Sequence, residues 1–275
     1  MNALILGAGG PAANSFELGI VAGLADGGVD VRDADLFVGT SAGARVAVKL
    51  AGATATEELY RRSLEMAGKP PSFDVKRWRA QILDAKRGGG APREILKRIR
   101  DLALSVHGDG NPRLAEMAAL DWPAKRVAIV AVEVESGERR VFERHSGVKL
   151  ADALAASGAM AGVWPAVTID GKHYVDGGMY STDNADVAGI ADRVLVIALR
   201  AGTPRMPVVG LEETTRTLEH VLVIQPDDNA QAALLAVGGN VLDPAVAQSM
   251  ASAARAQGLK LAPRIEAFWH KRRAA

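Results

Sequence analysis

Residues 39–43 of this chain read GTSAG and place Ser41 directly after the short apolar run DLFV. Such a run is typical of a buried strand, and G-x-S-x-G after a strand forms a sharp strand-to-helix turn. Gly39 and Gly43 lack the side chains that would clash in this turn, so the Ser41 hydroxyl can project toward a carbonyl carbon. The pattern therefore predicts a nucleophile elbow.

A glycine-rich turn joins the first predicted strand, ALIL at residues 3–6, to a predicted helix that contains FELGIVAGLADGG. The turn reads GAGGPAAN over residues 7–14. Small residues let several backbone N–H groups point outward together, and a helix N-terminus adds partial positive charge. The turn is therefore suited to hold an anion, either a phosphate or an oxyanion.

The same turn partly matches the dinucleotide-binding pattern G-x-G-x-x-G, with Gly7, Gly9 and Ala12 at its three positions. That pattern also needs an acidic residue about twenty positions later, at the end of a second strand. The second predicted strand here ends in the elbow instead. Nucleotide binding remains an alternative, although the acidic residues of this region precede the second strand: Asp30, Asp33 and Asp35.

A third pattern, YVDGG at residues 174–178, follows a predicted hairpin with Asp-Gly at its turn. It places Asp176 at a strand end, followed by Gly177 and Gly178. Two glycines after a carboxylate allow a tight turn that brings the carboxylate close to a hydroxyl. An ordinary Asp-Gly turn uses the same residues, so the pattern alone leaves both interpretations open.

Taken in order, the glycine-rich loop, GTSAG and DGG resemble the patatin-like phospholipases. The resemblance extends to FELGIVAGL, to LAASGAMAGVWPAVTIDGKHYVDGGMYSTDNADVA, and to LVIQPDD and NVLDP. It covers most of residues 2–250, apart from about 52–125. It implies a single α/β domain over residues 1–275, a three-layer α/β/α sandwich with a mainly parallel central sheet, and a Ser-Asp dyad of Ser41 and Asp176.

The implied reaction is hydrolysis of a lipid or other ester through an acyl-Ser41 intermediate, without a metal or other cofactor. A serine hydroxyl is a weak nucleophile and needs a base within hydrogen-bond reach. Asp176 can serve if burial raises the pKa of its carboxyl group, and it then protonates the leaving alcohol. The amides of Gly9 and Gly10 are predicted to stabilise the negative charge on the carbonyl oxygen.

The glycine-rich loop departs from the family pattern, which is usually a run of glycines, one variable residue that is often Arg, and a further Gly. Ala8 and Ala13 stand for glycines, Ala12 stands where Arg is frequent, and Pro11 has no amide to donate. If the turn required a positive φ at Ala8 or Ala13, alanine would be strained there by about 1 kcal/mol or more. A catalytically silent, lipid-binding relative is therefore a second candidate function.

An α/β-hydrolase triad is a further alternative, because Ser41, Asp176 and His220 follow the chain order Ser, Asp, His. Several strands precede the nucleophile in that fold, whereas one clear strand precedes the elbow strand here. His220 also begins the predicted strand HVLVI instead of following a strand. We therefore expect His220 to lie outside the site.

Composition fits a single α/β domain and excludes several classes of function. The 275 residues include 33 Lys and Arg against 32 Asp and Glu, and this balance gives no support for a nucleic-acid partner. The absence of cysteine excludes disulfides and thiol chemistry. The first apolar stretch has no basic region before it and stops at Gly7, and no run of about 18 apolar residues occurs. We therefore expect a cytoplasmic protein.

Residues 52–125 fit the resemblance least, and we expect them to form a helical cap or lid over the site. Helices are predicted around residues 73–83 and 93–106, and the glycines at 88–90 between them would suit a hinge. The second helix is expected to bury a single apolar face: Ile95, Ile99, Leu102 and Val106.

The last predicted strand is expected to lead into a polar loop with Asp227 and Asp228, which have no further metal ligands nearby. A final helix is predicted over residues 244–262, followed by a solvated tail. This tail also fits transient contact with an anionic lipid surface, because it places two aromatic residues beside three basic ones. The residues are Phe268, Trp269, Lys271, Arg272 and Arg273.

Overall fold

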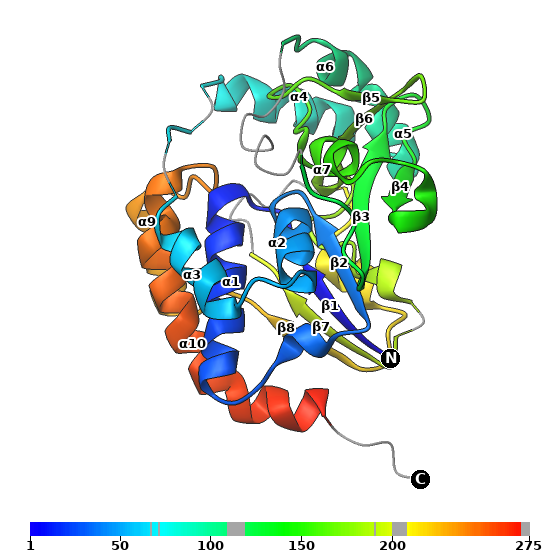
Figure 1. The fold of residues 1–275 in the computed structure, drawn as a ribbon. Helices are drawn as coiled ribbons and strands as arrows, with labels where there is room; N and C mark the ends of the chain where they lie inside the picture. Colours follow the sequence, from blue (N-terminus) through cyan, green and yellow to red (C-terminus); the bar gives the residue numbers. More distant parts are fainter. Residues whose placement is uncertain (67, 71, 109–118, 190, 200–207, 271–275) are drawn as a thin grey trace.

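The computed structural model describes all residues except 67, 71, 109–118, 190, 200–207 and 271–275. A central sheet lies between helices, so the predicted α/β class is confirmed (Figure 1). The strands are β1 (Asn2–Leu6), β2 (Leu36–Thr40), β3 (Arg126–Glu133), β4 (Arg139–Phe142), β5 (Val167–Ile169), β6 (Lys172–Asp176), β7 (Arg193–Ile197) and β8 (Val221–Ile224). The α-helices are α1 (Gly10–Asp26), α2 (Ala42–Ala51), α3 (Thr56–Leu64), α4 (Val75–Arg87), α5 (Pro92–Arg98), α6 (Arg100–Leu104), α7 (Leu150–Gly158), α8 (Leu211–Thr215), α9 (Asp228–Ala236) and α10 (Ala247–Trp269).

The sheet has the strand order β5-β6-β3-β2-β1-β7-β8, with β4 paired to β3 outside this path. Strands β3, β2, β1, β7 and β8 run parallel, as the predicted mainly parallel sheet requires. Strands β4 and β6 run antiparallel to β3. The carboxyl ends of β1 and β2 therefore meet at one edge of the sheet, and the glycine-rich loop and the elbow follow them there.

One face of the sheet is covered by α1, α2 and α10, and α1 and α10 lie side by side (Figure 1). Glycines line the contact between these two helices. A Cβ at Gly23 would lie 2.0 Å from the Arg255 carbonyl oxygen, and one at Gly258 would lie 2.4 Å from the Ile20 carbonyl oxygen. The backbones touch directly, so the last helix is held against the first.

The opposite face carries a thinner layer. Its apolar side chains, which include Ile5, Val38 and Val196, pack against α8 and the short 3-10 helix η5 (Ala185–Ala188). The sandwich is thus uneven, with the long helices on one side of the sheet.

Helix α10 continues to Trp269, so the predicted end at residue 262 was wrong. Pro263 lies inside the observed helix, directly after the predicted end, and removes one helical hydrogen bond. Ile265 and Trp269 are almost completely buried, and the Trp269 indole N–H donates to Asp33 Oδ1 at 2.6 Å. Burial of two large side chains outweighs the effect of the proline, and Trp269 is no part of a solvated tail. The basic residues of that tail lie outside the described residues: Lys271, Arg272 and Arg273.

The polar loop predicted at Asp227 and Asp228 is instead the start of α9. The Asp227 carboxylate accepts a hydrogen bond from the Ala230 amide at 3.0 Å. Asp227 therefore caps a helix, which is a common role for aspartate at this position.

The helices between α2 and β3 lie in two separate parts of the molecule. Helix α3 packs against α1 and α10, where Tyr60 contacts Ala22 and Ala251. Helices α4, α5 and α6 lie together at another end of the molecule, near β5, β6 and α7 (Figure 1). None of the described helices has the length and apolar character needed to cross a bilayer.

The single helix predicted over residues 93–106 is interrupted at Ile99, where φ is −90° and ψ is 4°. Helices α5 and α6 lie on either side of this break. The break changes the buried face, because Leu96, Ile99 and Ala103 are buried while Ile95 and Leu102 are half-buried. Packing against β3 and β6 determines which side chains of α5 and α6 are buried. The local sequence pattern alone therefore did not predict the buried face.

Candidate active site

Ser41 occupies the turn between β2 and α2, as the elbow prediction requires. Its backbone has φ 57° and ψ −114°, a left-handed conformation that is uncommon for residues other than glycine. Such strained residues persist only when their surroundings hold them, and they concentrate at functional sites. The conformation therefore marks Ser41 as a candidate functional residue.

The two elbow glycines permit close packing around Ser41. A Cβ at Gly43 would lie 2.1 Å from the Leu6 carbonyl oxygen, and one at Gly39 would lie 2.4 Å from Ala44 Cα. These distances are too short for any side chain, so α2 can start directly above the end of β1 only with glycine at these positions.

Asp176 lies at the end of β6, close enough to the Ser41 side chain for the hydroxyl to lower the pKa of its carboxyl group. The Gly178 amide also donates to Asp176 Oδ1, at 2.7 Å. Burial raises the pKa of Asp176 from 3.8 to about 6, while the bonds from Ser41 and Gly178 and the charge of Arg45 lower it. The carboxylate is therefore a stronger base than an exposed aspartate, and it is still mostly ionised at neutral pH.

The glycine-rich loop presents two backbone amides. Gly9 and Gly10 have φ values of 150° and 55°, which favour glycine. The preceding amides of Gly7 and Ala8 donate to backbone carbonyl groups at 3.2 and 2.6 Å. Within the described residues, the amides of Gly9 and Gly10 donate to no acceptor, and both residues are partly exposed. These two N–H groups are therefore available to an anion.

The alanine substitutions do not strain this loop. Neither Ala8 nor Ala13 has a positive φ, so the penalty considered for these positions does not arise. Ala13 lies inside α1, where its amide donates to the Gly9 carbonyl oxygen at 3.1 Å. The left-handed conformations fall on Gly9 and Gly10, the glycines that the chain retains.

The geometry does not favour dinucleotide binding at this loop. The Ala12 amide at the start of α1 is already bonded to the Val241 carbonyl oxygen at 3.2 Å. Asp35 accepts a backbone amide at 2.7 Å, and Asp33 accepts the indole N–H of Trp269. Both carboxylates are thus used in the fold, away from the carboxyl end of β2.

The arrangement of strands also rules out pairing of His220 with Ser41. Strand β8 runs parallel to β2, as do the two strands between them. His220 precedes β8, whereas Ser41 follows β2, so the two residues lie at opposite edges of the sheet. The triad of Ser41, Asp176 and His220 is not formed.

Two buried charged residues near the site were missed in the sequence. Glu17 in α1 is fully buried, and neither carboxyl oxygen accepts a well-formed hydrogen bond from the residues described. Burial raises its pKa well above the usual value, while the Gly7 amide and Arg45 lower it. Arg45 in α2 also lowers the pKa of Asp176, so its charge acts on both carboxyl groups. A signal existed, since each charged residue is flanked by apolar or small residues in its helix.

Ser157 is a third residue that the sequence did not single out. The Ser41 amide donates to Ser157 Oγ at 2.8 Å, and Ser157 Oγ donates to the Val130 carbonyl oxygen at 2.7 Å. Ser157 thus connects the strained elbow to β3. It has no distinguishing local signal, because 116 residues separate it from Ser41.

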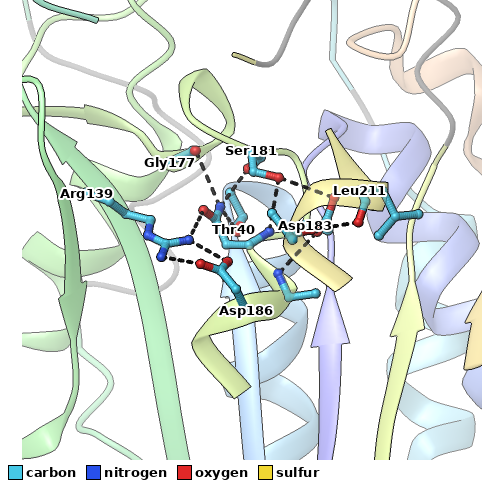
Figure 2. Close-up of polar contacts among 10 residues, drawn as sticks. Thr40, Arg139, Gly177, Ser181, Asp183, Asp186 and Leu211 are labelled. Carbon is cyan, nitrogen blue, oxygen red and sulfur yellow. Dashed lines mark hydrogen bonds and ion pairs between the residues drawn. The ribbon is translucent and has the colours of Figure 1, made fainter. Parts of the chain in front are cut away.

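A buried polar network lies beside the elbow (Figure 2). Its centre is Asn184, whose Nδ2 donates to Thr40 Oγ1 at 3.0 Å and to the Gly177 carbonyl oxygen at 3.4 Å. Arg139 Nη1 donates to Asn184 Oδ1 at 3.1 Å, and Arg139 also forms an ion pair with Asp186 at 2.5 Å. The network therefore joins the residue before Ser41 to the residue after Asp176.

These turns converge at one edge of the sheet. The Gly43 amide donates to the Gly7 carbonyl oxygen at 3.1 Å, and a Cβ at Gly178 would lie 3.1 Å from Ala8 Cβ. The glycine-rich loop thus touches both the elbow and the Asp176 turn. A hydroxyl, a buried carboxylate and two available amides are the groups that acyl transfer requires. No cluster of three or more metal-binding side chains occurs among the residues described.

The chain is similar to several known proteins. Residues 4–188 match the family described as patatin-like phospholipase. The structure of VipD from Legionella pneumophila is similar, with 16% identity and a TM-score of 0.40 over 74% of this chain and 50% of that chain. The structure of the type III effector protein ExoU is also similar, with 12% identity and a TM-score of 0.38 over 94% of this chain and 53% of that chain.

This chain spans about half the length of each of these two proteins. No curated protein matches it. The family match covers more than half of the chain and contains the glycine-rich loop, the elbow and the Asp176 turn. The chain therefore belongs to the patatin-like phospholipase family.

Proposed function

We propose that the protein is a serine lipid acyl hydrolase of the phospholipase A or esterase type, which cleaves carboxylic esters through an acyl-Ser41 intermediate. The observation that carries the proposal is the proximity of the Ser41 side chain, at the strained elbow, to the buried carboxylate of Asp176 in a chain of this family. The chemistry uses only groups of the chain itself and needs no metal or other cofactor.

In the first half of the reaction, Ser41 Oγ attacks the ester carbonyl carbon while Asp176 accepts the hydroxyl proton. The carbonyl oxygen becomes negative, and the amides of Gly9 and Gly10 donate hydrogen bonds to it. Collapse of this intermediate breaks the bond to the alcohol, which leaves with the proton from Asp176. The acyl group is then bonded to Ser41.

In the second half, water attacks the acyl carbon and Asp176 accepts a proton from it. The same two amides stabilise the second tetrahedral intermediate. Its collapse releases the carboxylic acid, and Ser41 Oγ recovers its proton from Asp176. The enzyme returns to its starting state.

The electrostatics of Asp176 suit both proton transfers. An aspartate with an ordinary pKa is a poor base at neutral pH, whereas a pKa of about 6 lies near the working pH. The buried charge of Arg45 favours the ionised form and limits the effect of burial. Asp176 can therefore accept a proton and later return it.

The second candidate, a catalytically silent lipid-binding relative, was motivated by strain at Ala8 or Ala13. Because neither residue has a positive φ, the argument from strain for a silent relative is weaker. The same labelling experiment separates the two functions.

We would treat the purified protein with a fluorophosphonate ester, which modifies an activated serine, and measure intact mass and the labelled peptide. We expect one adduct on Ser41, none with Ser41→Ala, and almost none with Asp176→Asn. Asp152→Asn is the matched control, because Asp152 is exposed on α7, and it should label like the wild type. No adduct, or labelling that does not depend on Asp176, would contradict the dyad and favour the silent relative.

The substrate is proposed only as a class, namely an ester of a lipid or lipid-like acid, met during transient contact with a membrane surface. Hydrolysis of a series of esters from short to long acyl chains would separate small esters from lipids. Phospholipids labelled in one acyl chain at a time would give the position of cleavage. Equal rates for all chain lengths would contradict a lipid substrate.

A further inference from the structure

Basic residues are concentrated in α4, α5 and α6, which we call the cap helices. Residues 75–104 contain nine Lys and Arg against three Asp and Glu, whereas the rest of the chain contains 24 against 29. A nearly neutral chain is thus divided into a strongly positive segment and a negative remainder. Such separation of charge creates a local positive electrostatic potential, which is not apparent from the net charge of +1.

The basic side chains of the cap helices are mostly open to solvent. In contrast, the exposed Arg61 on α3 is paired with Glu58 at 2.8 Å and with Glu65 at 3.2 Å. Six exposed cations of the cap helices form no ion pair with any residue that the structure describes: Lys76, Arg77, Arg79, Arg93, Lys97 and Arg100.

The cap helices adjoin the proposed active site. The Trp78 indole N–H donates to the Ala161 carbonyl oxygen at 2.7 Å. Ile82 packs in one cluster with Val175 and Met179, which lie on either side of the Asp176 turn. In Figure 1 these helices lie beyond the carboxyl end of β3, the end of the sheet where the elbow is found.

We propose that the cap helices dock on an anionic lipid surface and hold the Ser41 edge of the sheet against it. Charge complementarity carries the inference, because Lys and Arg near a surface are attracted to anionic headgroups. Val75 adds an apolar contact, since its side chain is 41% exposed at the start of α4 beside Lys76 and Arg77. The inference rests on the proposed function for its purpose, whereas docking itself requires no hydrolysis.

The test is sedimentation with vesicles of phosphatidylcholine alone or mixed with phosphatidylserine, using Ser41→Ala to keep the lipid intact. We expect binding to the mixed vesicles that weakens with salt. The double variant Lys76→Glu, Arg79→Glu should lower the partition coefficient by about tenfold or more. The matched control Lys260→Glu, Arg264→Glu changes the same charge on exposed positions of α10, and we expect a change below about twofold.

Three results would overturn the inference: no binding to the mixed vesicles, an equal loss in both double variants, or stronger binding to a DNA duplex than to the vesicles. Failure of the proposed function would look different, because the wild type would then show no fluorophosphonate adduct while vesicle binding persisted.

A second inference rests on the buried amide of Asn184, independently of the cap helices. Thr40 immediately precedes Ser41, and Gly177 immediately follows Asp176. One side-chain amide donates to the Ser181 carbonyl oxygen at 2.6 Å and also contacts both of these residues, at 3.0 and 3.4 Å. Asn184 therefore spans the elbow and the Asp176 turn.

The orientation of this amide is fixed on its other side. Arg139 can only donate, and its bond to Asn184 Oδ1 at 3.1 Å leaves Nδ2 directed to the acceptors. Arg139 is itself held by Asp186 through Nη1 at 2.6 Å and Nη2 at 2.5 Å. Asn184 also has a left-handed backbone, with φ 50°, which asparagine tolerates better than most residues.

We infer that Asn184 is a positioning residue that keeps Ser41 and Asp176 within hydrogen-bond reach. The inference deepens the proposed function and depends on it. Asn184→Gly retains the backbone freedom and removes the amide, so we expect the rates of fluorophosphonate labelling and kcat to fall by about tenfold, with KM unchanged.

Thr214→Val is the matched control, because it removes the hydrogen bond from Thr214 to Asp183 in the same buried network without touching the elbow. We expect it to label within about twofold of the wild type at a comparable loss of Tm. Thr40→Ser should retain the wild-type rate and Thr40→Val should reduce it like Asn184→Gly. Equal rates for Asn184→Gly and wild type, or equal losses in Thr214→Val, would overturn the inference. An unlabelled wild type would instead contradict the proposed function.

Discussion

The elbow and the glycine-rich loop are both strand-to-helix turns, but they use their backbone amides in opposite ways. Each joins a strand of the parallel sheet to a helix, and each has left-handed residues at the helix start. The elbow uses the amides of Ser41 and Gly43 internally, where they donate to Ser157 Oγ and to the Gly7 carbonyl oxygen. The loop leaves two amides without acceptors among the residues described.

The difference shows how one sheet edge can supply two kinds of chemical group. The elbow fixes its backbone so that a side chain projects, and the loop removes side chains so that its backbone is accessible. Strain at Ser41 is therefore supported by bonds, while the glycines of the loop avoid strain.

The largest effect should come from the partner of the elbow, Asp176. Asp176→Asn removes the base and should slow labelling by at least about 100-fold.

The raised pKa of Asp176 means that the folded state binds the proton more tightly than the unfolded chain, so stability falls as pH rises through about 4 to 6. The variant should therefore be more stable at about pH 8, by up to roughly 3 kcal/mol. Urea unfolding at two pH values checks this, and an unchanged midpoint would contradict it.

The next effect should come from the loop. Gly10→Ala places a methyl group 2.8 Å from Leu242 Cδ2 in a backbone with φ 55°, so the amide should move and the rate should fall by about 100-fold. Gly28→Ala is the control, because Gly28 has φ 85° and nothing within 4 Å of a Cβ. It should cost about 1 kcal/mol of stability and leave the labelling rate unchanged. Equal rates in both variants would remove Gly10 from the proposed site.

A smaller effect is expected at Ser157, which supports the elbow. Ser157→Ala removes the acceptor of the Ser41 amide and should cost about 1–3 kcal/mol of stability, with roughly tenfold slower labelling. Ser63→Ala is the control, since Ser63 is also buried but bonds to Tyr60 within α3. If both variants labelled equally fast, the elbow would need no support from β3.

The pH dependence of labelling follows from the base. Asp176 must be ionised to accept the proton, so the rate should rise with pH to a plateau with a midpoint at about 6. About one pH unit below the midpoint, the rate should be about tenfold lower. A profile that is flat between about pH 5 and 8 would show that Asp176 is not the base.

The smallest effect should come from restoring a family glycine. Ala8 lacks a positive φ, so Ala8→Gly should change the labelling rate by less than about twofold. It should lower stability by about 0.5–1 kcal/mol, because glycine is more flexible when unfolded. A rate increase of more than about fivefold would show that the alanine impairs the loop, and the contrast between the two turns would have to be revised.

The sequence predicted the turns because their signals are local. Glycines next to Ser41 and Asp176, each after a strand pattern, identify a turn without knowledge of the rest of the fold. Ser157 and Asn184 could not be found in this way, since they act across 116 and 144 residues of chain. Serine and asparagine are also common, so their types alone carry little information.

Helix α10 shows the same limit for the fold. Local rules end a helix near Pro263, but the burial of Ile265 and Trp269 is a property of the assembled protein. The sheet and its order of motifs were predictable, whereas the end of this helix and the break at Ile99 depend on packing partners distant in the chain.

The contact between α1 and α10 means that the folded domain extends beyond the residues that match the family. The family match ends at residue 188, yet β7, β8 and α10 follow it, and β7 pairs directly with β1. A fragment cut at that boundary would expose an unpaired edge of β1 and the face of α1 that packs on α10 to water, which invites aggregation. A fusion of this domain to another protein should therefore include the chain as far as Trp269.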